Sequence, residues 1–237
     1  MSQWPAGCTE IHMPLPYPDR AAAGRALASR LTSFGGAPDL LVLALPRGGL
    51  PVAAEVARAL NAPLDVFVVR KLGVPGQEEL AMGAIASGGA RVLNQDVIAM
   101  LRIPAAAIEA AAAKETKEIA RREQLYRGDR PAPDVRNRVV ILVDDGLATG
   151  STMRAALRAL RELGPKQIMV AAPVGAAETC EELQGEADEV ICAATPEPFS
   201  AVGEWYEDFT QITDGEVRYM LAEASRRDAT ESGIRVR

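Results

Sequence analysis

The strongest constraint on the fold is an unbroken apolar run, Val139 to Val143, that leads directly into two acidic residues, a short loop and a helix. Such a run predicts a strand that is buried on both faces, as in a parallel sheet. From Met153 to Leu163 apolar residues recur at helical spacing, which predicts an amphipathic helix. Asp144, Asp145 and the loop Ala148 to Thr152 lie between the two elements. A small, hydroxyl-rich loop that opens a helix presents backbone N–H groups and the positive end of the helix dipole, which suits a phosphate.

Other apolar runs alternate with helical segments along the chain, as expected for parallel strands joined by right-handed crossovers. Strands are expected at residues 40–45, 64–69, 81–86, 90–93, 167–172 and 189–193. Helices are expected at residues 20–33, with Asp19 as N-cap, and at 52–60, 104–126 and 176–183. The sequence therefore predicts an α/β fold with an open, mainly parallel sheet flanked by helices. The proline-rich residues 1–18 are expected to form an irregular arm before a single domain over residues 19–237.

The composition argues against several classes of function. With a net charge of −6 and only 4% aromatic residues among its 237 residues, the chain is not expected to bind nucleic acid. The absence of a membrane-spanning apolar stretch and of a signal-peptide pattern predicts a cytoplasmic protein without a membrane partner. Cys8, Cys180 and Cys192 are interpreted as isolated cysteines, with neither a disulfide framework nor a metal-site motif. The single histidine, His12, is interpreted as a bystander.

A second candidate site element is the turn Pro46-Arg47-Gly48-Gly49, which follows the predicted strand at residues 40–45. It should lie at the same sheet edge as Asp144, where open α/β sheets bind their ligands. Two glycines let the backbone approach a ligand closely, and the Arg47 guanidinium is suited to phosphate oxygens.

A third element is the cation pair Arg70-Lys71, which follows the predicted strand at residues 64–69. Gly73, Pro75 and Gly76 are expected to keep the segment 70–79 a mobile loop. Cations at a strand end beside a pyrophosphate loop would offset negative charge that develops on a leaving group. The alternative is a solvated charge pair at the start of a loop.

The segment 139–152 resembles the signature of the type I phosphoribosyltransferases, in which hydrophobic residues precede two acids, a short variable stretch and Thr-Gly-x-Thr. Over residues 19–221 the chain is similar to a bacterial group of this family without an assigned substrate. The resemblance implies that Asp144 and Asp145 bind the ribose 2- and 3-hydroxyls of phosphoribosyl pyrophosphate (PRPP) and contact magnesium through water. It also implies that the 5-phosphate is wrapped by Ala148, Thr149, Gly150, Ser151 and Thr152.

The same resemblance gives roles to the other segments. Arg47, Gly48 and Gly49 match the family's pyrophosphate loop, which often contains a non-proline cis peptide. Arg70 and Lys71 resemble the strand-end pair of adenine phosphoribosyltransferases, which implies that they stabilise departing pyrophosphate below a loop that closes. Residues 196–221 would supply a small hood at the sheet edge, with Trp205 and Phe209 as candidates for binding the acceptor base; alternatively, these aromatic residues dock a tail helix.

The resemblance therefore predicts a magnesium-dependent phosphoribosyltransferase that transfers the 5-phosphoribosyl group from PRPP to a nitrogen acceptor, such as a nucleobase, and releases pyrophosphate. Ala148 stands where 6-oxopurine enzymes place an aspartate, which disfavours hypoxanthine and guanine. The alternatives are a non-catalytic PRPP or nucleotide sensor, and an enzyme that uses the same loop for hydrolysis or phosphorolysis. The family resemblance implies a homodimer.

Overall fold

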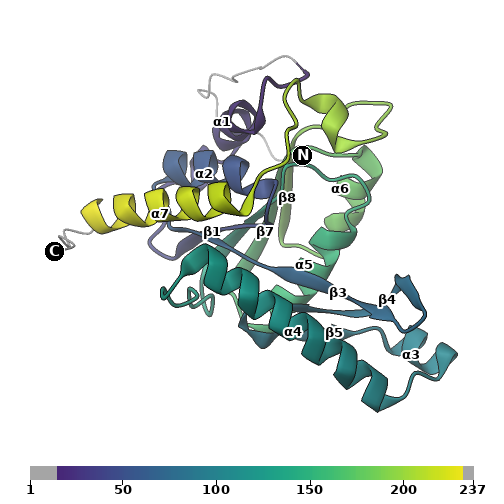
Figure 1. The fold of residues 1–237 in the computed structure, drawn as a ribbon. Coiled ribbons are helices and arrows are strands. Elements are labelled where there is room, and N and C mark those ends of the chain that lie inside the picture. The colour runs from purple at the N-terminus through teal and green to yellow at the C-terminus, as the bar shows by residue number, and fades with distance from the viewer. Residues whose placement is uncertain (1–14, 232–237) are drawn as a thin grey trace.

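The predicted parallel sheet lies at the centre of the molecule (Figure 1). In the computed structural model, which describes residues 15–231, its strands follow the order β2-β1-β6-β7-β8 and every neighbouring pair is parallel. The strands are β1 (Leu40–Ala44), β2 (Leu64–Val66), β6 (Val139–Val143), β7 (Gln167–Val174) and β8 (Glu189–Ala194). Every residue of β1 and β6 is buried, which explains their unbroken apolar runs and confirms the predicted fold class.

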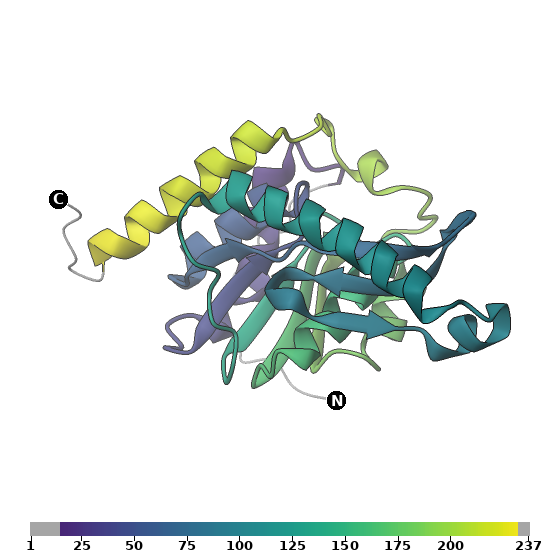
Figure 2. The ribbon, with the colours of Figure 1, turned by 60° about the horizontal axis from the view of Figure 1, so that its bottom comes forward.

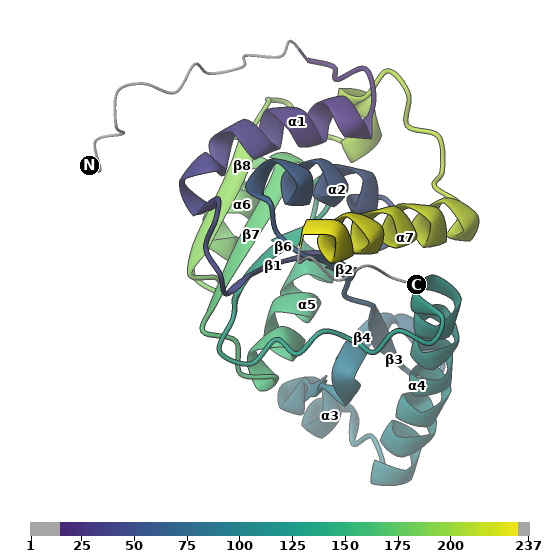
Figure 3. The same cartoon turned by 90° about the vertical axis from the view of Figure 1, so that its left-hand side faces the viewer.

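Helices cover both faces of this sheet (Figures 1 and 3). Alternate residues of each strand point to opposite faces, so one large hydrophobic core lies on each face of the sheet. One core includes α1 (Arg20–Arg30), α2 (Gly49–Leu60) and α7 (Asp214–Glu231), and the other includes α5 (Ser151–Glu162) and α6 (Ala177–Leu183). A smaller cluster consists of Tyr17, Ala23, Ala26, Val174 and Tyr206. Asp19 caps α1 by accepting a hydrogen bond from Ala22 N at 2.6 Å, as predicted. Three short 3-10 helices lie elsewhere in the described chain, at Thr32–Phe34, Ser87–Gly89 and Val202–Trp205.

A second, antiparallel sheet lies beside the first and carries the order β3-β4-β5. It consists of β3 (Val69–Val74), β4 (Gln77–Ala86) and β5 (Arg91–Leu93), followed by α3 (Gln95–Leu101) and the long α4 (Ala105–Arg127). Figure 2 shows α4 running across this small sheet. Leu72 and Met82 of the sheet and Ile108 of α4 share the first core, which fixes the two elements against each other.

The prediction of one strand at 64–69 followed by a mobile loop at 70–79 is wrong. Val74 pairs with Gln77, so Pro75 and Gly76 form a tight turn between β3 and β4. Gly76 adopts a φ of +79°, and proline followed by a left-handed glycine is the signature of a type II turn. The residues that suggested a loop are therefore the centre of a β-hairpin.

The interpretation of all three cysteines as isolated is also wrong. Cys180 of α6 and Cys192 of β8 form a disulfide with Cα atoms 6.9 Å apart. The helix α6 and the next strand, β8, pack together here, which brings two cysteines 12 residues apart in sequence into contact. Cys8 and His12 lie outside the described residues, and within residues 15–231 no helix is both long and apolar enough to cross a membrane.

Candidate functional site

The predicted pyrophosphate turn and the acid pair lie against each other at the carboxyl edge of the parallel sheet. Ala44 pairs with Val143, so the strands β1 and β6 end side by side. The peptide between Pro46 and Arg47 is cis, as the family resemblance implied. A Cβ on Gly48 would overlap the Asp145 carboxylate, and one on Gly49 would lie 2.7 Å from Val143 O and 2.9 Å from Asp144 Cα. Only glycine fits at these two positions, so the Gly-Gly pair is what lets the turn pack directly against Asp144 and Asp145.

Gly49→Ala is expected to push the turn away from the acid pair, because the atoms that its Cβ would meet belong to the backbone and cannot rotate aside. A displacement on the order of 1 Å at a reacting site costs about 100-fold in rate. The measurement is pyrophosphate release from PRPP, the reaction that the family resemblance implies, with Gly185→Ala as control because its Cβ would meet nothing closer than Glu182 O at 3.4 Å. Unchanged activity in Gly49→Ala would contradict the close fit of the turn and the acids.

Asp144 and Asp145 differ in their electrostatic surroundings. Asp145 forms a salt bridge with Arg20, whose Nε donates to Asp145 Oδ2 at 2.8 Å. Burial raises the pKa of Asp145 and the Arg20 guanidinium opposes this rise. Burial and the negative charge of Asp145 raise the pKa of Asp144 well above its ordinary value, and its Oδ1 accepts only the Asp145 N–H, at 2.9 Å, among the described residues. Asp144 is therefore the acid whose charge is poorly compensated by the described residues.

Arg20 is a site residue that the sequence analysis missed. Its side chain is 8% exposed, its Nη1 donates to Thr210 O at 2.9 Å, and its guanidinium lies 3.9 Å from the ring centroid of Phe209. Arg20 thus links the first turn of α1 to the acid pair and to the segment after β8. No local pattern indicates this role, because the partners of Arg20 are 125 and 190 residues away in sequence.

The segment after β8 is docked on the start of the described chain and on the acid pair. Tyr17 and Tyr206 form a parallel bridge, and the Tyr206 hydroxyl donates to Asp145 O at 2.5 Å. Burial, and secondarily the charge of Asp145, raise the pKa of Tyr206. Trp205 stacks on Phe199 at a ring distance of 6.0 Å and its Nε1 is buried without a hydrogen-bond partner among the described residues. Phe209 is 38% exposed and Trp205 is half-buried, so Phe209 is the more accessible of the two predicted acceptor-binding residues.

The predicted 5-phosphate loop, residues 148–152, is anchored through its carbonyl groups. Ala148 O accepts from Thr179 Oγ1 at 2.6 Å, and Thr149 O accepts from Arg154 Nη1 at 2.7 Å. A trans peptide points its N–H opposite to its C=O, so the N–H groups of Thr149 and Gly150 face away from these anchors. Gly150 has a φ of +66° and begins α5 without a side-chain cap, while Ser151 and Thr152 are exposed. Within the loop the Ser151 N–H makes only a long hydrogen bond, 3.5 Å, to Thr149 Oγ1, so the start of α5 is suited to a phosphate.

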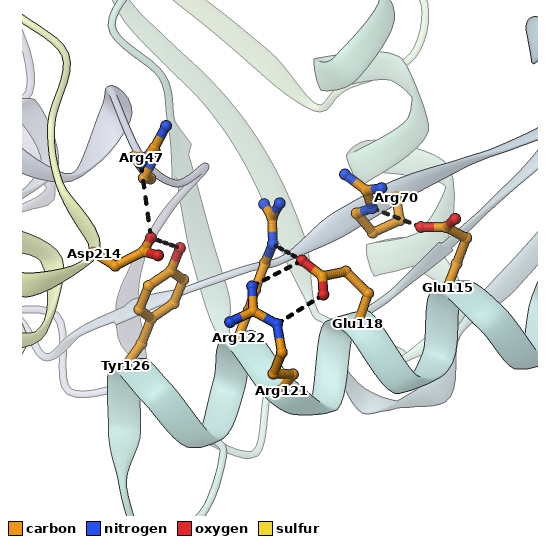
Figure 4. A network of polar contacts seen from close by, with 8 residues as sticks. All are labelled: Arg47, Arg70, Glu115, Glu118, Arg121, Arg122, Tyr126 and Asp214. Atoms are coloured by element: carbon orange, nitrogen blue, oxygen red, sulfur yellow. Dashed lines mark hydrogen bonds and ion pairs between the residues drawn. The ribbon is translucent and has the colours of Figure 1, made fainter.

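Two of the predicted cations, Arg47 and Arg70, lie along α4, and each is close to an acidic residue (Figure 4). Arg70 Nε donates to Glu115 Oε2 at 2.7 Å. Arg47 Nη1 lies 3.9 Å from Asp214 Oδ1, which also accepts from the Tyr126 hydroxyl at 2.8 Å. Arg70 and the exposed Lys71 line a cavity of about 670 Å³ between β3 and α4. The structure thus places the turn that carries Arg47 beside Asp144 and Asp145, whereas Arg70 and Lys71 belong to the antiparallel sheet.

The donor set fits a magnesium ion that arrives with its substrate. Within residues 15–231 no cluster of three or more histidine, cysteine or acidic residues could form a dedicated metal site. Magnesium prefers oxygen ligands, keeps most of its water molecules and commonly binds through one or two carboxylates together with substrate phosphates. Asp144, a carboxylate without a cationic partner among the described residues, and Asp145 are the side chains that would hold such an ion.

The fold and the candidate site define an α/β protein with an acid pair and a phosphate-type loop at the carboxyl edge of a parallel sheet. Residues 17–202 match the family described as the phosphoribosyl transferase domain. The chain belongs to this family.

Relatives agree with this assignment. The chain is 48% identical over 217 residues to Rv0571c of Mycobacterium tuberculosis strain H37Rv and to MT0597 of strain CDC 1551, which both carry the name of a phosphoribosyl transferase. The match covers 92% of this chain and 48% of theirs, so the chain spans about half the length of these curated relatives. The crystal structure of TT1426 from Thermus thermophilus is 42% identical, with a TM-score of 0.77 over 87% of this chain and 98% of that one.

Proposed function

We propose that this protein is a magnesium-dependent phosphoribosyltransferase that moves the 5-phosphoribosyl group from PRPP to a nitrogen acceptor and releases pyrophosphate. The observation that carries the proposal is the fit of the Gly48-Gly49 turn against Asp144 and Asp145, because it joins a candidate pyrophosphate loop to a candidate ribose site without intervening space. The predicted 5-phosphate loop starts at the end of the same strand as the acids, three residues beyond Asp145.

In the reaction, the bond between the ribose anomeric carbon and pyrophosphate breaks, and its electron pair leaves with pyrophosphate. A bond forms between that carbon and the acceptor nitrogen. Asp144 and Asp145 orient the ribose hydroxyls, and the N–H groups of residues 149–152 hold the 5-phosphate. Arg47, Arg70 and Lys71 compensate the charge of the departing pyrophosphate, so catalysis rests on positioning and electrostatics. Magnesium, which Asp144 and Asp145 would hold through water, would supply further positive charge to offset that of the departing pyrophosphate.

The acceptor is expected to be a nucleobase other than a 6-oxopurine, because the methyl group of Ala148 has no proton to exchange with the base. Phe209 is the aromatic residue that would contact it, under the hood predicted for residues 196–221. A homodimer is part of the same proposal and is tested by the mass of the protein in solution.

The first experiment is calorimetry of PRPP binding with and without magnesium, followed by pyrophosphate release over a panel of bases and amines. Magnesium-dependent binding together with release on one acceptor is the expected result. Binding without release on any acceptor would favour the alternative, a PRPP-sensing regulator of the same fold. An absence of PRPP binding would overturn the proposed function.

A further inference from the structure

The face of α4 that carries Glu115 and Tyr126 also carries an arginine, Arg122, in addition to the nearby Arg47 and Arg70. Residues 115, 122 and 126 lie on one side of a helix, since seven and eleven residues are close to two and three full turns. Glu115 contacts Arg70 and Tyr126 contacts the Asp214 that lies beside Arg47. In Figure 4 the Arg122 guanidinium extends away from α4 into the space bordered by Arg47 and Arg70. The helix therefore presents Arg122 between two cations that the proposed function already uses.

Arg122 and Arg70 are held in the same way. In each, the Nε atom donates to a glutamate of α4 at 2.7 Å: Arg122 to Glu118 Oε1 and Arg70 to Glu115 Oε2. Among the described residues, the terminal nitrogens of Arg122 donate no hydrogen bond, and its side chain is 28% exposed. A guanidinium that is fixed through Nε keeps its two terminal amino groups available for two oxygens of one phosphate, and loses little freedom on binding.

The neighbouring Arg121 is held differently. Both its Nε and its Nη2 donate to Glu118, at 2.8 and 3.0 Å, so the carboxylate occupies one full edge of its guanidinium. Its side chain is 58% exposed and, with Arg70 and Glu118, borders an open cavity of about 660 Å³. Because of both arginines the pKa of Glu118 falls to about 2, which keeps this anchor ionised.

Tyr126 links the neighbourhoods of Arg122 and Arg47: it lies one helical turn after Arg122 in α4, and its hydroxyl donates to the Asp214 carboxylate that lies 3.9 Å from Arg47 Nη1. Burial and the hydrogen bond to Asp214 raise the pKa of Tyr126 to about 12, while the positive charges of Arg122 and Arg47 both oppose the rise. The cations of the turn and of α4 therefore act on one phenol group.

We propose that Arg122 is a pyrophosphate-binding residue, which completes a row of three guanidinium groups, Arg47, Arg122 and Arg70, and is oriented by Glu118. This inference rests on the proposed function and adds to it a residue that lies outside the four segments in which the sequence analysis placed the candidate site residues. A row of three separate cations matches a ligand with two linked phosphates better than one with a single phosphate.

The test is calorimetry of magnesium pyrophosphate and, separately, of ribose 5-phosphate with the full chain and its Arg122→Ala, Arg122→Lys and Arg121→Ala variants. Loss of a charge-assisted hydrogen-bonding group predicts that Arg122→Ala binds pyrophosphate about 10- to 100-fold more weakly, with unchanged ribose 5-phosphate binding. Arg122→Lys should recover part of the loss because it restores the charge without the planar fork. Arg121→Ala should stay within about threefold, as is usual for an exposed charge.

Wild-type pyrophosphate affinity in Arg122→Ala, or equal losses in Arg122→Ala and Arg121→Ala, would overturn the inference while the proposed function stands. If the unmodified protein binds neither pyrophosphate nor PRPP, the proposed function and this inference both fail. Thermal unfolding of each variant shows whether it is folded, and Arg122→Lys carries the test if the alanine variant is not.

Discussion

Asp144→Asn is expected to weaken PRPP binding about 10- to 100-fold and, at the same time, to stabilise the folded protein. The loss follows from removing one charged hydrogen-bond partner of the ribose, a contribution of roughly 1.5–3 kcal/mol. The gain follows from removing a buried charge that lies next to Asp145 and lacks a cationic partner among the described residues. Asparagine retains an oxygen that accepts the Asp145 N–H, so the local backbone is preserved. We expect a gain of about 1 kcal/mol in the free energy of unfolding.

The gain depends on pH in a defined direction. A carboxyl group whose pKa is raised by folding loses its proton more readily in the unfolded chain, so it destabilises the native state as pH rises above its ordinary value of 3.8. The stability difference between Asp144→Asn and the unmodified protein should therefore be absent near pH 3 and grow towards neutral pH. Denaturant unfolding at several pH values measures it. A variant that is less stable than the unmodified protein at neutral pH would contradict the assignment of Asp144 as the uncompensated acid.

Arg20→Ala is expected to have the largest effect on stability. Both partners of the Arg20–Asp145 salt bridge are largely buried, at 8% and 14% side-chain exposure. Removing one partner leaves the other charge buried and unpaired, which costs about 3–5 kcal/mol. Arg20→Ala also removes the contacts to Thr210 and Phe209, so the segment after β8 should loosen. Urea unfolding measures the loss, and hydrogen exchange of residues 205–210 measures the loosening.

The matched control for Arg20→Ala is Arg25→Ala in the same helix. Arg25 is 51% exposed and its Nη1 lies 3.9 Å from Glu55, so the change should stay within about 0.5 kcal/mol. The pKa of both acids should rise in Arg20→Ala, because the guanidinium that lowers them is gone. PRPP binding of this variant should therefore weaken most at low pH. Equal stability of the two variants would show that the salt bridge is not a structural anchor.

The Arg20–Asp145 salt bridge also means that Asp145→Asn, unlike Asp144→Asn, should destabilise the fold.

The sequence predicted those parts of the molecule that depend on local pattern. The buried strands β1 and β6, the capping of α1 by Asp19 and the helix after residue 150 all carry their signal within a few residues. The contact between the Gly48-Gly49 turn and the acids could be anticipated as well, because parallel strands bring their carboxyl ends to one edge.

The sequence did not predict features that depend on long-range packing. Arg20 reads as an ordinary first residue of a helix, and only the tertiary fold brings it to Asp145. Cys180 and Cys192 meet because α6 packs on β8. The Pro75-Gly76 turn carried a usable signal, but glycine and proline are typical both of hairpin turns and of irregular loops. The alternation of buried Leu72 and Val74 with less buried neighbours distinguishes the hairpin once the strands are known.

The contacts of Arg20 also determine when, during synthesis, the site becomes complete. A chain emerging from the ribosome would have made the sheet strands β1, β2, β6 and β7, the turn and the phosphate-type loop before residues 206–210 are available. Until those residues arrive, Arg20 lacks its anchor at Thr210, and Asp145 lacks the Tyr206 hydroxyl on its carbonyl. The acid pair therefore gains its last contacts from residues 206–210, which are synthesised after every strand of the parallel sheet. A chain that ends before residue 206 would hold Asp144 and Asp145 without these contacts.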